Sequence, residues 1–226
     1  MSLVYQKDSE VAYNKIVDLL QSRAISEDVF LSERALSAEL GLGRTPIREA
    51  LRDLIRDGLL ESHPTRGTLL KMLSVTDLQD LYEIRFAIEG LAAALASERG
   101  NVSELEPFVK LYDGVLRDPE SHDLSDVHDR GVQMHEKIIA MTNNKRLLEM
   151  YRPFRIRFRI PFGIIKSDTP ERVIQSAKEH REIALSIMSR NAVGSETLIR
   201  QHLRESLSFR INLLVDRTYY ASLKSA

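Results

Sequence analysis

Three histidines lie on three separate segments of the chain: His135, His180 and His202. Each has apolar residues three or four positions away, the spacing that turns a helical side chain toward a core. Three imidazoles that meet in a helical core are suited to Zn²⁺, Ni²⁺ or a similar borderline ion, and they leave positions open for another ligand. No HxxxH pair occurs in the chain, so unrelated core or surface histidines are the alternative.

Arginines with a regular spacing carry a second possible chemistry. Arg44, Arg48, Arg52 and Arg56 recur every four residues beside an apolar helical stripe. On an isolated helix such a ladder is a solvated face with internal ion pairs. Here it follows a Gly-Leu-Gly turn, so we expect Arg44 and Arg48 to contact DNA and Arg52 to reach a phosphate. Arg56 is expected to pair with Asp53 or to face solvent.

Three further arginines have a spacing that suits an anion. Arg85 lies next to the apolar stripe of a long predicted helix, and Arg155 and Arg159 are four residues apart on one helical face. The planar guanidinium offers a fork of two N–H groups to a carboxylate. The alternative is that all three form surface ion pairs.

The elements that position the first arginine ladder are three helices and a hairpin. The first helix is predicted over 9–24, with Ser9 as a possible N-cap. The second begins at the N-cap Ser32 and ends at Gly41, and its inward-facing residues are predicted to be Ala35, Leu36, Ala38 and Leu40. Residues 59–62 and 68–71 are predicted to pair as a β-hairpin, with Arg66 at the tip.

The third helix follows Gly43. Thr45 is predicted as its N-cap, with Pro46 in the first helical position, where a missing N–H costs nothing. Its buried stripe is predicted to be Ile47, Ala50, Leu51, Leu54 and Ile55. The order helix, tight turn, helix, hairpin is typical of a winged helix-turn-helix, which lays one helix in the major groove of DNA.

The rest of the chain reads as helices alone. Breakers such as Gly100-Asn101 and Asp118-Pro119 separate the periodic segments, which are predicted over 76–99 (with Thr76 as the N-cap), 103–117, 124–142, 144–160, 170–190 and 195–217. We therefore predict a mainly α fold, with a winged helix-turn-helix domain over 1–71 and an all-α bundle over 72–226.

Composition narrows the class of protein. The 226 residues include no cysteine, which excludes disulfides and thiolate metal sites. No apolar run approaches the ~20 residues of a membrane span, and the first residues lack a signal-peptide pattern, so we expect a cytosolic protein without a membrane partner. The net charge is −1 and the first 71 residues carry 10 basic and 11 acidic side chains. DNA affinity must then depend on where the charges lie.

The N-terminal motif resembles the DNA-binding domain of the GntR family of bacterial transcription regulators. The residues that carry the resemblance are Leu31 to Arg34, Leu36, Leu40 to Leu51, Leu54, Asp57 to Leu59 and Arg66-Gly67. In that family, five of the matching positions contact operator DNA. In this chain they are Arg34, Arg44, Thr45, Arg48 and Gly67. Gly43 stands where the family often has Ser or Thr, so only its backbone N–H is available to a phosphate.

Residues 76–217 resemble the FCD sensor domain of the FadR subfamily. The matching residues are Leu81 to Arg85, Glu89, His135, Ile138, Asn144, Leu147, Glu179-His180, Ile183 and His202. Many members bind a divalent metal through three His and an Asp four residues before the first His. Gly131 stands at that position here, and Asp129 lies about 240° round the helix from His135, so it cannot take the ligand's place. The resemblance implies Zn or Ni on three histidines, with weaker affinity or altered geometry. The alternative is a metal-free site that hydrogen-bonds an anionic effector.

Together these resemblances imply a homodimeric, ligand-responsive repressor of double-stranded operator DNA. A small organic acid is the implied effector, with Arg85 and either Arg155 or Arg159 as carboxylate clamps. We expect no enzyme, because Glu136 and Glu179 adjoin histidines in sequence and would face away from them on a helix. The alternatives are a metal-dependent hydrolase that uses the three histidines and an effector-independent DNA-binding protein.

Overall fold

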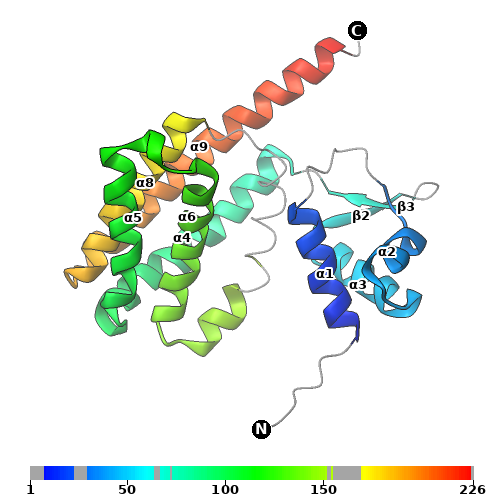
Figure 1. Ribbon diagram of the computed structural model, residues 1–226, viewed down its shortest axis with the longest axis horizontal. Helices are drawn as coiled ribbons and strands as arrows, with labels where there is room; N and C mark the ends of the chain where they lie inside the picture. Colours follow the sequence, from blue (N-terminus) through cyan, green and yellow to red (C-terminus); the bar gives the residue numbers. More distant parts are fainter. Residues whose placement is uncertain are drawn as a thin grey trace. The chain divides into compact units, whose positions relative to one another are not determined.

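A computed structural model of the chain describes residues 8–22, 30–63, 67–71, 73–151, 154 and 169–224. These residues form two compact units, and the chain passes from one to the other between Leu73 and Ser74. Helices joined to a small three-stranded sheet make up the first unit and helices alone the second, which confirms the predicted mainly α fold (Figure 1). Among the described helices, none is both long and apolar enough to cross a lipid bilayer.

The N-terminal unit is a winged helix-turn-helix. Its elements are α1 (Asp8–Ser22), β1 (Phe30–Leu31), α2 (Glu33–Leu40), α3 (Arg44–Arg56), β2 (Leu60–His63) and β3 (Gly67–Leu70). The sheet is antiparallel with the order β1-β3-β2. A strand of two residues is too short to show alternation in the sequence, so β1 was not predicted. The core includes Ile16, Ile47, Leu54, Leu60 and Leu70.

Helix α2 has the predicted ends and a narrower buried face than predicted. Ser32 is its N-cap and accepts a hydrogen bond from the backbone N–H of Ala35 at 3.5 Å. Gly41 ends it with a φ of +66°, a left-handed conformation that favours glycine. The prediction that Ala35 and Ala38 face inward is wrong: both are exposed, and Leu36 is the buried residue. The eight-residue helix turns only one side to its neighbours.

Helix α3 begins two residues earlier than predicted, at Arg44 and not at Pro46. Its N-cap is Gly43, in an extended conformation, so the prediction of Thr45 as the N-cap is wrong. The first helical hydrogen bond runs from the N–H of Ile47 to the carbonyl of Gly43 at 3.3 Å. Pro46 therefore still precedes the first N–H that the helix needs, which is why it is tolerated at the third helical position. The predicted buried stripe is confirmed at Ile47, Ala50, Leu51 and Leu54, and Ile55 is half-buried.

The C-terminal unit is an all-helical bundle. Its helices are α4 (Val75–Arg99), α5 (Glu106–Arg117), α6 (Leu124–Met141), α8 (Pro170–Met188) and α9 (Ala192–Lys224), with 3-10 turns η1 (Val102–Leu105) and η2 (Pro119–Ser121) and a helical segment over 145–151. Helix α4 packs most extensively on α9, and α8 packs on α5, α6 and α9. The rest of the helix predicted over 144–160 lies outside the described residues, apart from Phe154.

Helix α4 starts at a capping box and not at the predicted Thr76. The Ser74 hydroxyl accepts a hydrogen bond from the N–H of Asp77 at 3.0 Å, and the Asp77 carboxylate accepts one from the N–H of Ser74 at 2.9 Å. This reciprocal pair satisfies two N–H groups at once, which a single threonine cap cannot do.

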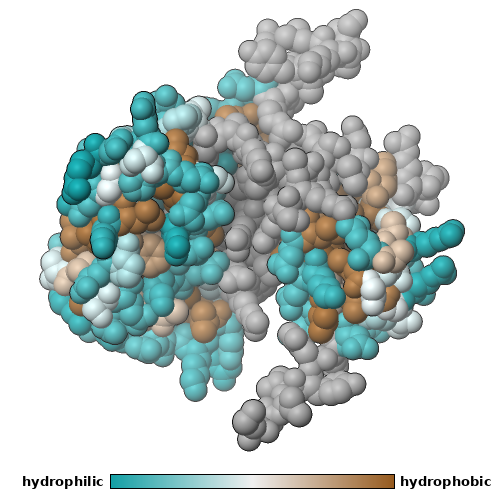
Figure 2. All heavy atoms as spheres, viewed as in Figure 1, coloured by the Kyte–Doolittle hydropathy of each residue, from teal (hydrophilic) through white to brown (hydrophobic). Residues whose placement is uncertain are grey.

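Polar residues lie mainly on the described surface, and the largest apolar side chains lie in the interior (Figure 2). Hydrophilic residues cover most of the described surface in the view of Figure 2, with hydrophobic residues between them. Large side chains such as Tyr82, Leu105, Tyr112 and Met134 are fully buried in the bundle. His135, His180 and His202 are buried with them, at 5–6% exposure. Imidazoles inside an apolar bundle need polar partners, so their contacts indicate the chemistry of the site.

Candidate DNA interface and metal centre

The residues predicted to contact DNA lie in the exposed part of α2 and α3. Arg34, Arg44, Thr45, Arg48 and Arg52 are all exposed. At the wing, Gly67 is exposed and has a φ of +99°, a conformation that suits glycine. Arg66 lies outside the described residues. Their roles in binding DNA stay predictions.

Arg48 is held by a carboxylate that the sequence analysis missed. Its Nε lies 3.0 and 3.1 Å from the two carboxylate oxygens of Glu33, and its Nη2 lies 2.9 Å from Oε2. The hydrogen bond from Arg48 lowers the pKa of Glu33 below its ordinary value. The Arg48 side chain is nevertheless 52% exposed. The contact joins α2 to α3 across 15 residues, so helical spacing alone could not reveal it. Arg56 pairs with Asp53 at 2.8 Å, as predicted.

The start of α3 adds backbone donors to this surface. Gly43 makes no side-chain cap, and the helix takes its first N–H donor from Ile47. The N–H groups of Arg44 and Thr45 thus have no acceptor within the helix. Such a helix N-terminus attracts phosphate through its N–H groups and its dipole. Both side-chain and backbone donors are therefore available on one exposed helix end.

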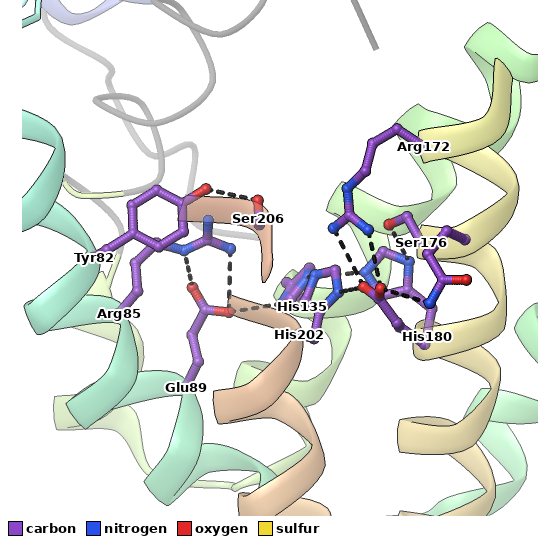
Figure 3. A network of polar contacts seen from close by, with 11 residues as sticks. Tyr82, Arg85, Glu89, His135, Arg172, Ser176, His180, His202 and Ser206 are labelled. Carbon is purple, nitrogen blue, oxygen red and sulfur yellow. Dashed lines mark hydrogen bonds and ion pairs between the residues drawn. The ribbon is translucent and has the colours of Figure 1, made fainter. Parts of the chain in front are cut away.

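The three histidines meet in the C-terminal unit, as predicted. His135 comes from α6, His180 from α8 and His202 from α9 (Figure 3). Nε2 of His135 lies 3.0 Å from Nε2 of His180 and 3.3 Å from Nε2 of His202. One ligand atom from each of the three lies within 4.8 Å of the others. Side chains from three helices far apart in the sequence thus present their nitrogens to a common point.

These distances fit a divalent metal ion. With a Zn–N bond of about 2.0–2.1 Å, two nitrogens of a tetrahedral site lie about 3.3 Å apart, and two at right angles lie about 2.9 Å apart. The two measured separations are within this range. Imidazole is a ligand that Zn²⁺ and Ni²⁺ both accept. Three histidines leave at least one coordination position for water or another ligand.

A buried ion pair orients the first histidine. Nδ1 of His135 lies 2.6 Å from Oε2 of Glu89, and Oε1 of Glu89 accepts a hydrogen bond from Nε of Arg85 at 2.6 Å. Glu89 is 1% exposed. Burial alone would raise its pKa, but Arg85 and His135 together lower it, so the carboxylate stays ionised. A carboxylate at Nδ1 favours the proton there and leaves the lone pair of Nε2 for a metal.

A matching arrangement supports the third histidine. Nδ1 of His202 lies 2.7 Å from Oε2 of Glu179, and Arg172 donates to both oxygens of Glu179, at 2.9 and 3.3 Å (Figure 3). Burial raises the pKa of Glu179, but the hydrogen bonds from His202 and Arg172 outweigh it and lower the pKa to about 2. Two nitrogen lone pairs then face each other at 3.3 Å between His135 and His202. A cation between them relieves that repulsion, which favours a metal over an empty site.

Burial keeps the imidazoles of His180 and His202 neutral. It lowers the pKa of His202 to about 4, although Glu179 acts in the opposite direction. It lowers the pKa of His180 well below its ordinary value, and the neighbouring His202 and His135 add to this shift. Neutral imidazole is the form that binds a metal. The Nδ1 of His180 has a weaker partner, the Ser176 hydroxyl at 3.4 Å.

The other predicted site residues have mixed outcomes. Arg85 lies at the site, where Glu89 occupies its Nε and Nη2 at 2.6 and 3.4 Å. Arg155 and Arg159 lie outside the described residues. Asp129 is exposed, in keeping with the expectation that it cannot replace the missing ligand at Gly131. Glu179 reaches His202 on the next helix, a contact that the sequence analysis did not foresee. Arg172, which donates to Glu179, was not among the site residues predicted from the sequence.

Two known domains match this chain over most of its length. Residues 8–70 match the family described as bacterial regulatory proteins, gntR family. Residues 80–205 match the FCD domain. The chain belongs to the GntR family. The FCD domain assigns it to the FadR-type subfamily, whose members are transcription regulators and not enzymes, so the predicted family and the absence of an enzymatic role are confirmed.

Individual relatives agree with this assignment. The Nta operon transcriptional regulator of Aminobacter aminovorans is 33% identical over 132 residues, which cover 57% of this chain and 61% of that protein. The HTH-type transcriptional repressor GlaR of Escherichia coli is 27% identical over 176 residues, covering 74% of this chain and 80% of GlaR. Among solved structures, E. coli McbR/YncC matches with a TM-score of 0.76 at 18% identity, covering 94% of this chain and 99% of that one. This last similarity shows the fold.

Proposed function

We propose that this GntR regulator is a homodimeric cytoplasmic repressor whose DNA binding is controlled by a metal ion and a small organic acid in the C-terminal unit. The observation that carries the proposal is the meeting of three histidines: Nε2 of His135 lies 3.0 Å from Nε2 of His180 and 3.3 Å from Nε2 of His202. A regulator without a ligand has no need of three buried imidazoles backed by one buried and one half-buried ion pair, since such groups are costly to bury.

The charges around the histidines support an anionic effector. Arg85 and Glu89 form one neutral pair, and Arg172 and Glu179 form another. Imidazole contributes no charge when it binds a metal, so a divalent ion on the three histidines would keep its full positive charge. A carboxylate that binds at an open coordination position neutralises part of that charge in a site with little water. The bound metal supplies a Lewis-acidic centre for an oxygen ligand, and the histidines hold it.

On the DNA side we assign specificity to the exposed surface of α2 and α3. Arg44 and Arg48 are assigned to base edges, and Arg34, Arg52, Arg66, Thr45 and Gly67 to bases or phosphates around them. Two copies of the winged unit bind two half-sites of a near-palindromic operator. The effector acts by changing the placement of one winged unit relative to the other, so that they no longer match the half-site spacing. Arg85 and either Arg155 or Arg159 contact the acid.

A gel-shift experiment with the full chain tests this function. The DNA is first selected from a random pool by the protein, and binding is then measured with a panel of mono-, di- and tricarboxylic acids, with Zn²⁺, with Ni²⁺ and with chelator. We expect one class of acid to release the DNA only when a metal is present. His202→Ala removes a ligand and should abolish release, whereas His122→Ala, at a histidine outside the three-His cluster, serves as the matched control.

The outcomes separate the alternatives. Release by an acid that persists in chelator and in His202→Ala favours a metal-free site that hydrogen-bonds the effector. Selected DNA that no acid releases under any condition favours a regulator without an effector. Sedimentation of the protein with and without DNA measures the oligomeric state, and a monomer on a single half-site contradicts the dimer.

A further inference from the structure

Gly131 of α6 lies against one of the three histidines. It is buried, and a Cβ atom added to it would lie 2.7 Å from Cε1 and 3.1 Å from Nδ1 of His180. Carbon atoms in contact are ordinarily about 3.5–4.0 Å apart. The imidazole of His180 therefore occupies the space that a side chain at residue 131 would need.

His180 has no room to move away from α6. On another side its ring stacks on Tyr112, with ring centroids 5.7 Å apart and an interplanar angle of 24°. Tyr112 is fully buried. The ring centroids of His135 and His202 lie 5.1 and 4.4 Å from that of His180. A close-packed interior does not absorb a displacement of several tenths of an ångström without loss of contacts elsewhere.

We propose that Gly131 is a positioning residue of the metal centre: its missing side chain creates the space in which the His180 imidazole lies. This inference rests on the proposed metal site. The resemblance to the FCD domain implies an Asp ligand at this position, and the simple expectation from it is that Gly131→Asp repairs a defective site. The packing leads to the opposite result, because an aspartate side chain at this position and His180 in its present place exclude each other.

The experiment measures the Zn²⁺ dissociation constant of the full chain by competition with a chromophoric chelator. The variants are Gly131→Ala, Gly131→Asp, His180→Ala and the double variant with Gly131→Asp and His180→Ala. The control is Gly114→Ala on α5, where an added Cβ would lie 2.8 Å from Nε2 of His122. His122 is only half-buried and can turn away, so this control should bind Zn²⁺ like the unchanged protein.

We expect Gly131→Ala and Gly131→Asp each to weaken Zn²⁺ binding by about tenfold or more, since changes to the groups that orient a metal ligand typically cost at least that much affinity. In the His180→Ala background the space is vacant, and there Gly131→Asp should tighten binding. This reversal of sign is the signature of a shared space. Tighter binding by Gly131→Asp in both backgrounds overturns the inference, because it means that the new carboxylate and the His180 imidazole fit together.

Two further results keep the test decisive. If the unchanged protein binds neither Zn²⁺ nor Ni²⁺, the proposed metal site itself is wrong and the role of Gly131 falls with it. If Gly131→Asp does not fold, Gly131→Ala carries the test together with the NMR signals of the histidine rings in the metal-free protein. The ring signals of His180 should shift in Gly131→Ala and stay unchanged in Gly114→Ala. Unchanged His180 signals and unchanged affinity in Gly131→Ala contradict the inference.

Discussion

The ion pair between Arg85 and Glu89 permits a sharp test of how the proposed metal centre is supported. Glu89 is 1% exposed and the Arg85 side chain 12% exposed, and they meet at 2.6 Å. Glu89→Gln keeps the shape of the side chain and removes its charge. The guanidinium of Arg85 then stays buried opposite a neutral amide, and Nδ1 of His135 loses its ionised partner.

The magnitude follows from the burial. Removing one partner of a buried ion pair costs about 3–5 kcal/mol in the free energy of unfolding, because the other charge loses its counter-charge where little water can reach it. For a chain of this size that corresponds to a fall of about 6–20 °C in the Tm. Loss of the carboxylate behind a metal-binding histidine should also weaken the metal by about 10–100-fold.

The assay is thermal and urea unfolding of the protein in chelator, followed by a metal titration. Glu104→Gln is the matched control: Glu104 meets Lys137 at 2.8 Å, but the two side chains are 40% and 39% exposed. An exposed pair contributes at most about 1 kcal/mol. Equal losses of stability in Glu89→Gln and Glu104→Gln refute the reasoning from burial.

A double replacement separates stability from metal binding. Arg85→Met combined with Glu89→Leu removes both charges and leaves apolar groups of similar size, which is often close to neutral for stability. His135 still lacks its carboxylate in this variant, so the metal should remain weakly bound. Recovery of both properties would mean that Glu89 does not act through His135.

Three other predictions follow from the geometry. Arg48→Ala should weaken binding to selected DNA by about 1–3 kcal/mol. It should not lower the Tm, because the Arg48 side chain is 52% exposed. Gel shifts and thermal melts check this, and a variant that still binds its selected DNA tightly and specifically contradicts it. Leu54→Ala, at a fully buried position of α3, should cost about 2–5 kcal/mol in urea unfolding of the N-terminal unit. In chelator, the protein should lose stability as the pH falls below about 6.5, since the unfolded chain then binds a proton at His202 that the folded chain, with a pKa of about 4, refuses. The loss should continue below pH 4.5 as Glu179, with a folded pKa of about 2, resists protonation; unfolding curves that do not change between pH 7 and pH 4 would contradict this.

The N-terminal unit was largely predictable because its signals are local. The buried stripe from Ile47 to Leu54 was predicted from helical periodicity. The end of α2 was predicted from Gly41, because glycine favours the left-handed conformation that ends a helix. The errors were also local. Thr45 and Thr76 are good capping residues by type, but the N-caps are Gly43 for α3 and Ser74 for α4. Pro46 is tolerated at the third helical position because its missing N–H would have no acceptor within the helix. Ser74 is favoured over Thr76 because it completes a capping box with Asp77.

For the three-histidine site, sequence and tertiary structure contributed different information. By itself the sequence singled out the three histidines, since apolar neighbours at helical spacing predict that each one faces the inside of a bundle. The packing of α4, α6, α8 and α9 decided which carboxylate supports which imidazole, that Arg172 belongs to the site, and that Gly131 lies against His180. Such contacts depend on distances of a few tenths of an ångström between residues far apart in the chain. Periodicity fixes only the face of a helix, whereas its depth and its neighbours are set by the packing of the whole unit.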